Sequence, residues 1–145
     1  MGVSHIEFVG PALLEHNIKF AKIIFWIAAI WGIVILTPLY FIFDTIGRQD
    51  PPPITHPAFY YGFIAVALAW QIGFIVIARD AVRFRLMMIP AVLEKFGYGI
   101  SLIVLTLQRR LHGVDVVFGG IDLLFGVLFL VAFVGTEPDR IVTKT

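Results

Sequence analysis

Four long apolar stretches, separated by short polar turns, dominate this chain of 145 residues. A helix needs about 20 consecutive apolar residues to cross a bilayer, and the first stretch has no charged residue between Lys22 and Asp44. We therefore predict an all-α fold, a transmembrane four-helix bundle that forms a single integral membrane domain over residues 1–145. The four predicted spans are residues 23–43, 56–78, 86–107 and 114–134.

A short interfacial helix is predicted in front of the first span, because Pro11 suits the first turn of a helix and the residues that follow it are modestly amphipathic. The orientation of the bundle follows from Lys and Arg, which are enriched on the cytoplasmic side of membrane proteins. One side of the predicted bundle holds Lys19, Lys22, Arg79, Arg83, Arg85, Arg140 and Lys144, and the other holds Arg48, Arg109 and Arg110. We therefore expect both termini in the cytoplasm.

The composition supports the membrane assignment and narrows the function. The chain is 59% hydrophobic and 14% charged, whereas soluble domains are about 45–50% apolar and about 25% charged. It has no cysteine, which excludes disulfides, thiolate catalysis and iron–sulfur ligation. The basic residues lie at segment ends rather than in one patch, so no nucleic-acid partner is expected. No motif indicates a metal site or a cofactor, and none is predicted.

The last apolar stretch carries an aspartate well inside the predicted membrane. Helical steps of four, three and four residues place Asp115, Gly119, Asp122 and Gly126 on one face of this helix. A carboxylate at such depth costs about 2.5–3.5 kcal/mol, so Asp122 should face protein and have a partner. The neighbouring glycines allow another helix to come close enough to supply that partner.

Lys95, in the third span, is the best partner for Asp122 in this chain. At 1.5 Å per residue, Lys95 lies about 13 Å deep from one side and Asp122 about 12 Å deep from the other. Across a layer of about 30 Å their heights differ by about 5 Å, which a lysine side chain can bridge. A third span that starts at Pro90 instead of residue 86 would make Lys95 shallower. A second contact is expected between Glu94 and Gln71, which lie at similar heights.

These polar residues have two interpretations. Interhelical polar contacts often only fix helix packing, and each contributes about 0.6 kcal/mol on average. Ionisable groups inside a membrane also commonly mark a functional pocket. In addition, small residues recur along one side of the second span and predict a ridge for close helix packing, made by Gly62, Ala65, Ala69 and Gly73.

The last three spans also carry short motifs that are shared with a known family. They are Ala78-Arg79-Asp80, Arg83, Glu94-Lys95, and Ile121-Asp122-Leu123-Leu124-Phe125-Gly126. With these motifs, residues 59–136 resemble the bacterial four-helix membrane proteins of the DoxX-like kind. The resemblance implies a bundle in the bacterial inner membrane and no particular reaction. The redox or sulfur-linked roles proposed for some DoxX relatives have no cysteine to act through in this chain.

Three classes of function are compatible with this sequence. The best supported is a small accessory or binding protein that holds a lipid or other apolar ligand against Lys95, Asp122 and Glu94, because aromatic residues are abundant and polar groups few. Its partners would be membrane lipids, a second copy of the chain or a larger membrane complex. The alternative is a proton-coupled transporter that uses the same three residues and works as a dimer. An enzyme is the least supported class, because no catalytic constellation is present.

Overall fold

In the computed structural model, residues 11–49, 53–111 and 113–137 are described, and all their regular elements are helical. The elements are α1 (Pro11–Leu36), η1 (Thr37–Phe41), α2 (Phe43–Gln49), α3 (Pro57–Arg79), η2 (Arg85–Met87), α4 (Met88–Leu107) and α5 (Gly113–Gly135). Four segments are long and apolar enough to cross a membrane, namely Ala12–Phe41, Pro57–Arg79, Arg85–Leu107 and Gly113–Gly135. The predicted fold is confirmed: the chain is an all-α, multi-pass membrane protein.

The helix boundaries differ from the predicted ones near the N-terminus. α1 begins at Pro11, as expected, but continues without a break past Lys22 to Leu36. The segment predicted to lie at the interface is therefore the first part of α1, because neither glycine nor proline interrupts the helix there. The first half of the loop predicted after the first span folds as α2. Pro90 lies in the first turn of α4, where proline is tolerated, so the third span begins before it.

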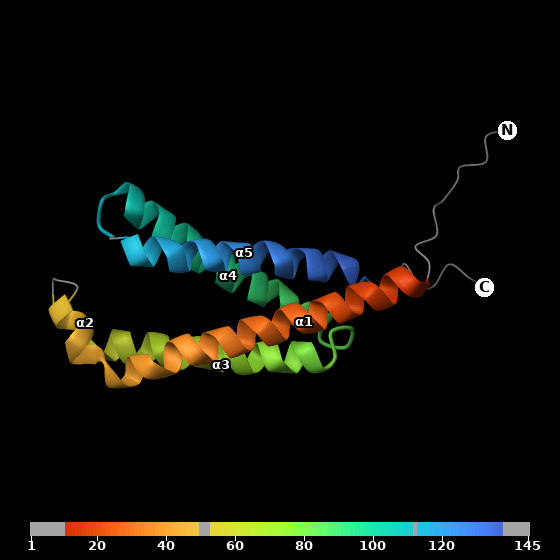
Figure 1. Cartoon of the computed structure of the whole chain (residues 1–145), viewed down its shortest axis with the longest axis horizontal. Coiled ribbons are helices and arrows are strands. Elements are labelled where there is room, and N and C mark those ends of the chain that lie inside the picture. The colour runs from red at the N-terminus through yellow and green to blue at the C-terminus, as the bar shows by residue number, and fades with distance from the viewer. Residues whose placement is uncertain (1–10, 50–52, 112, 138–145) are drawn as a thin grey trace.

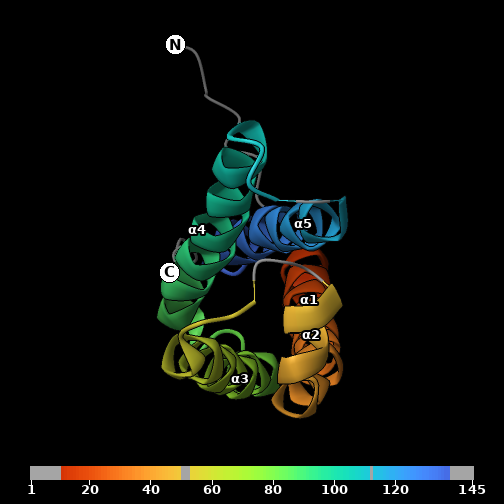
Figure 2. The same cartoon turned by 90° about the vertical axis from the view of Figure 1, so that its left-hand side faces the viewer.

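The four long helices associate as two pairs. α1 packs along α3, and α4 packs along α5, while α1 and α5 join the pairs and α3 and α4 scarcely touch. Figure 1 shows the pairs close together at the end where α1 begins and α5 ends, and diverging toward the end that carries α2. Viewed from that second end, the helices surround a central space (Figure 2). We call the first end the closed end and the second the open end.

The hydrophobic core occupies the closed half of the molecule. Its centre is a set of three fully buried rings from three helices: Phe25 stacks on Phe129 with ring centroids 4.0 Å apart, and Phe74 meets Phe129 edge-on at 5.1 Å. Small residues pack around these rings, including Ala21, Ala28, Ala29, Ala78, Ala81, Ala91 and Ala132. Interleaving large rings with alanines lets the helices approach closely, so this half leaves little space between them.

Polar side chains tie the closed end together at the C-terminus of α5. The last carbonyls of a helix have no partner within the helix itself. Arg85 donates from Nε to the carbonyl oxygen of Phe133 at 3.0 Å, and its guanidinium lies 3.9 Å above the Phe133 ring. Asn17 of α1 donates from Nδ2 to the carbonyl oxygen of Gly135 at 3.2 Å. Both bonds connect the end of α5 to other segments.

Glycines allow α4 and α5 to pack against each other, as predicted for Gly119 and Gly126. A Cβ atom at Gly126 would lie 3.2 Å from the Phe96 ring of α4. A Cβ atom on Gly99 of α4 would lie 2.6 Å from the Leu123 side chain and 3.1 Å from the carbonyl oxygen of Gly119. The two backbones therefore come close together where Gly99 faces Gly119.

The predicted packing ridge of α3 does not face another helix in the described part of this chain, and docking of the ridge against a larger membrane complex stays a prediction. Gly62, Ala65 and Ala69 are exposed, and Gly73 is half-buried. The buried face of α3 is a different one, formed by Ile64, Ala67, Gln71, Phe74, Ile77 and Ala78. The spacing of small residues was regular enough for a packing face, but α3 turns a different face toward α1.

Candidate functional site

The predicted pair of Lys95 and Asp122 forms between α4 and α5. Lys95 Nζ lies 3.0 Å from Asp122 Oδ1, which is both a hydrogen bond and an ion pair. Only 7% of Lys95 is exposed, and the Asp122 side chain is 15% exposed. Lys95 Nζ also lies 5.4 Å from the centre of the Phe74 ring, which favours the cation. The lysine therefore reaches from α4 across the bundle toward α5 and α3.

Glu94 joins this pair instead of contacting Gln71. Its Oε2 lies 3.3 Å from Lys95 Nζ, and its Oε1 accepts a hydrogen bond from the same atom at 3.4 Å. Adjacent positions on a helix point about 100° apart, but the long lysine side chain turns back far enough to reach its neighbour. Two carboxylates, those of Glu94 and Asp122, thus share one ammonium group.

Gln71 is buried in the wall of the same region, and only one of its two polar side-chain atoms has a hydrogen-bond partner among the described residues. Its Nε2 donates to the carbonyl oxygen of Ala67 at 2.9 Å. Its Oε1 has no hydrogen-bond partner among the described residues, and the same holds for Glu94 Oε2, which faces Lys95 without hydrogen-bond geometry. The carboxamide lies against Gly32 of α1, where a Cβ atom would collide with it.

These residues lie at the inner end of a cavity of about 950 Å³ between the two helix pairs. We call it the central cavity. Its walls are mainly apolar and include the rings of Trp31, Tyr60, Phe63, Tyr98, Phe118 and Phe125. Its charged lining residues are Glu94, Lys95, Asp115 and Asp122. The cavity ends near Phe125, which packs on Phe129 of the closed-end core.

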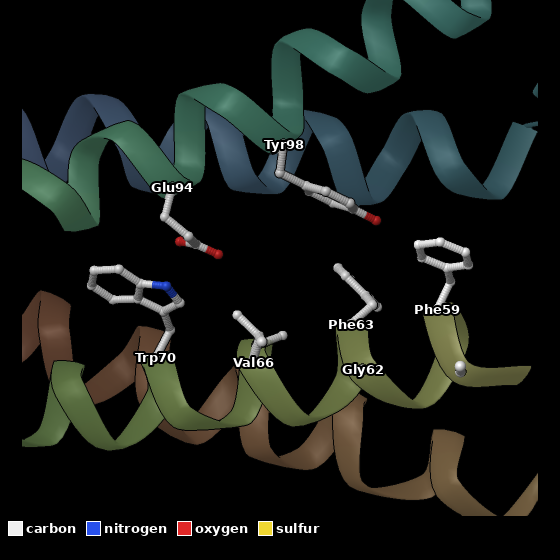
Figure 3. Close-up of a pocket in the computed structure, with 9 residues that line it drawn as sticks. Phe59, Gly62, Phe63, Val66, Trp70, Glu94 and Tyr98 are labelled. Atoms are coloured by element: carbon white, nitrogen blue, oxygen red, sulfur yellow. The ribbon is translucent and has the colours of Figure 1, made fainter.

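A second hollow of about 450 Å³ lies between α3 and α4, and we call it the lateral groove (Figure 3). Phe63, Ala67, Glu94 and Tyr98 line both the groove and the central cavity. The rings of Phe63 and Tyr98 stack with centroids 5.9 Å apart and bridge the two helices. Figure 3 shows the Glu94 carboxylate directed from α4 toward α3, between Trp70 and Val66.

Several residues of the site were not predicted from the sequence. Tyr98 lies one turn after Glu94, so a polar ring on the same helix face was a usable signal. Gly32 interrupts an apolar helix, and an isolated glycine in such a helix indicates a close approach by another group. Phe63 had no distinguishing signal, because one phenylalanine among 14 cannot be assigned to a cavity wall without the fold.

The arrangement suits binding rather than covalent chemistry. Of the predicted centre, the structure brings together Lys95, Asp122 and Glu94 directly, and it places Gln71 in the wall of the same cavity. An apolar cavity with a few polar groups gathered at one end is the usual form of a small-molecule site. No protein-family model matches the chain, and no curated protein or solved structure matches it.

Proposed function

We propose that this protein is a membrane-embedded binding protein whose central cavity holds an apolar or amphipathic ligand against Lys95, Glu94 and Asp122. The observation that carries the proposal is the position of these charges at the inner end of a cavity of about 950 Å³. Ligand sites in proteins have volumes of roughly 300–1,000 Å³ and are mostly apolar with a few polar groups. The central cavity has the volume and the lining for one ligand of that kind.

The alternative role for the charges, helix packing alone, fits the geometry less well. A contact that only fixes packing needs surrounding side chains that fill the space around it. Such packing exists in the closed half, around Phe25, Phe74 and Phe129. Lys95 and its two carboxylates lie instead at the border between this core and the cavity, where a ligand can reach them.

Native mass spectrometry of the gently solubilised protein tests the proposal, with a variant that fills the cavity. Val117 lines the cavity, whereas its neighbour Val116 does not; the two are 60% and 45% exposed, so the lining of the cavity is what distinguishes them. We expect wild type and Val116→Trp to carry the same additional mass. Val117→Trp should lose it, and Asp122→Asn should hold it less tightly. Retention of that mass by Val117→Trp at the wild-type level, or an empty wild type, would contradict a ligand in the central cavity.

One feature favours the proton-coupled carrier as a second candidate. The cavity lies at the open end and stops at the aromatic core of the closed end, which is the shape of one state of an alternating-access carrier. Transport would require the closed end to open, including the ties of Arg85 and Asn17 to α5. Uptake into proteoliposomes that depends on a pH gradient and is lost in Glu94→Gln would favour a carrier, whereas binding without uptake would favour the binding protein.

The membrane context is proposed from the sequence. We place the closed end in the cytoplasm, because Lys19, Lys22, Arg79, Arg83 and Arg85 belong to segments that meet there. The other two basic residues predicted on that side, Arg140 and Lys144, lie outside the described residues. From the sequence motifs we also propose that the protein belongs to the DoxX-like family and lies in the bacterial inner membrane. Assembly with a second copy or with a larger membrane complex is proposed from the sequence as well.

A further inference from the structure

We propose that the ligand of the central cavity is an amphiphile with an ammonium head group that bears N–H donors, and that this head group binds at Glu94. The inference rests on the proposed function and specifies the chemistry of the ligand. Three independent features lead to it: the charges at the inner end of the cavity, the hydrogen-bond acceptors left there without donors, and the aromatic side chains next to Glu94.

The charges at the inner end of the cavity favour a cation. Lys95 is the single ammonium group there and already lies 3.0 Å from Asp122 and 3.3 Å from Glu94. An anionic head group would have to approach two carboxylates in an environment of low dielectric, where repulsion between like charges is strong. A cationic head group instead gives the second carboxylate a partner of its own.

Two buried acceptor atoms receive no hydrogen bond from the described residues, although one of them, Glu94 Oε2, is ion-paired with Lys95 at 3.3 Å. Glu94 Oε2 and Gln71 Oε1 are both buried acceptors without a hydrogen bond among the described residues, and only 2% of Gln71 is exposed. Buried polar groups normally have a partner, and an unmet acceptor destabilises the folded protein. Both residues line the central cavity. A head group that donates N–H bonds meets this requirement, whereas a quaternary ammonium group does not.

Aromatic side chains line the lateral groove next to Glu94. Trp70 and Tyr98 flank it in the lateral groove, and Phe63 lies beyond Tyr98 on the opposite helix (Figure 3). The faces of aromatic rings attract cations, most strongly where water is excluded. An ammonium group held at Glu94 would form an ion pair with the carboxylate and would lie next to the ring of Trp70.

The lateral groove gives such a ligand a path from the bilayer to Glu94, while its apolar part lies in the central cavity. The groove lies between α3 and α4, the two neighbouring helices that scarcely touch, and its volume is about 450 Å³. Its outer part is formed by apolar side chains such as Phe59 and Val66. A ligand dissolved in the bilayer can therefore reach Glu94 from the side. Both a free alkylamine and a lipid with a primary amine head group have this chemistry.

Four ten-carbon probes separate the contributions of charge and hydrogen bonding. Decylammonium has charge and donors, decyltrimethylammonium has charge alone, decanol has a donor alone, and decanoate has the opposite charge. Binding is followed by the fluorescence of Trp31 and Trp70, which line the cavity and the groove, in phosphatidylcholine nanodiscs with empty nanodiscs subtracted. We expect decylammonium to bind most tightly, by roughly tenfold over each other probe, the typical difference for one charge-assisted hydrogen bond.

Variants locate the head group. Glu94→Gln should weaken decylammonium by roughly tenfold and change decanol binding little. Glu15→Gln is the control, because it removes a carboxylate from the other end of the protein, where the side chain is 68% exposed. Trp70→Leu keeps all charges and should weaken both ammonium probes more than decanol. Competition by a short-chain phosphatidylethanolamine would identify a lipid as the source, and competition by decylammonium alone would identify a free amine.

The outcomes separate this inference from the proposed function. The ammonium site is wrong if decylammonium and decanoate bind equally well, or if Glu94→Gln keeps the wild-type preference for decylammonium. A ligand in the central cavity is still supported in that case if Val117→Trp blocks binding. If no probe binds and no mass co-purifies with the wild type, the proposed function itself fails.

Discussion

The most consequential single side chain is Lys95, because two partly buried carboxylates depend on it. Lys95→Met leaves Glu94 and Asp122 without their cation, and removing one partner of a buried ion pair costs about 3–5 kcal/mol. The double variant Lys95→Met/Asp122→Asn removes one of the two stranded charges and should be more stable than the single variant. Thermal unfolding in detergent measures both. Equal melting temperatures for the two variants would mean that Lys95 and Asp122 are not coupled.

Gly32 is a second residue whose role can be isolated. A Cβ atom at Gly32 would collide with the Gln71 carboxamide, whereas a Cβ atom at Gly120 of α5 meets nothing within 4 Å. We expect Gly32→Ala to be less stable than Gly120→Ala by at most about 1 kcal/mol, because the atoms that it meets are the end of the flexible Gln71 side chain, which can turn away. The further change Gln71→Ala should recover part of this loss, since the clash is with that side chain. If the melting-temperature changes of Gly32→Ala and Gln71→Ala simply add in the double variant, the two residues are not in direct contact.

At the residue scale, the sequence predicted the ion pair but not its full set of partners. Depth in the membrane and helical periodicity depend only on residue spacing, so they were enough to pair Lys95 with Asp122. The contact between Lys95 and Glu94 depends on side-chain rotamers, which spacing does not determine. For the same reason, the predicted contact between Glu94 and Gln71 did not form, and Gln71 bonds to the carbonyl oxygen of Ala67 instead.

At the element scale, α4 and α5 form the tightest helix pair, and a comparison of two nearby glycines tests it. Gly99 faces the Leu123 side chain and the Gly119 carbonyl, whereas a Cβ atom at Gly97 meets nothing within 4 Å. We expect Gly99→Ala to lower stability by about 1–3 kcal/mol. Gly97→Ala should be neutral or stabilising by up to about 1 kcal/mol, because alanine is the better helix former. A melting temperature for Gly99→Ala at or above that of Gly97→Ala would contradict the close approach.

The helices themselves were predictable, but their packing faces were only partly so. The ends of the four spans predicted from the long apolar stretches agree with the observed helix ends to within a few residues, except at the start of α1. The small-residue faces of α3 and α5 looked alike in the sequence. Gly119 and Gly126 pack against α4, whereas Gly62 and Ala65 of α3 are exposed. The difference is that α5 also carries Asp122, whose need for a partner decides which face turns inward.

At the scale of the whole molecule, the two ends of the bundle serve different purposes. The closed end holds the aromatic core and the polar ties to the end of α5. The open end holds the central cavity. This division could not be predicted from the sequence, because the cavity depends on the angle between the two helix pairs, which the spacing of residues does not determine. It leaves Lys95 at the border of the two halves.

The most direct test of an open central cavity is the reactivity of single cysteines, which is free of background because the chain has none of its own. Phe118 lines the cavity, Leu124 is 59% exposed but lines no part of it, and Ala78 is buried in the closed half. A charged methanethiosulfonate reagent attacks thiolates that water can reach. We predict that Phe118→Cys reacts quickly from the side opposite the predicted cytoplasmic face, and that Leu124→Cys and Ala78→Cys do not. If Phe118→Cys reacts no faster than the other two, water does not enter the central cavity from the open end, which contradicts an open cavity between the helix pairs.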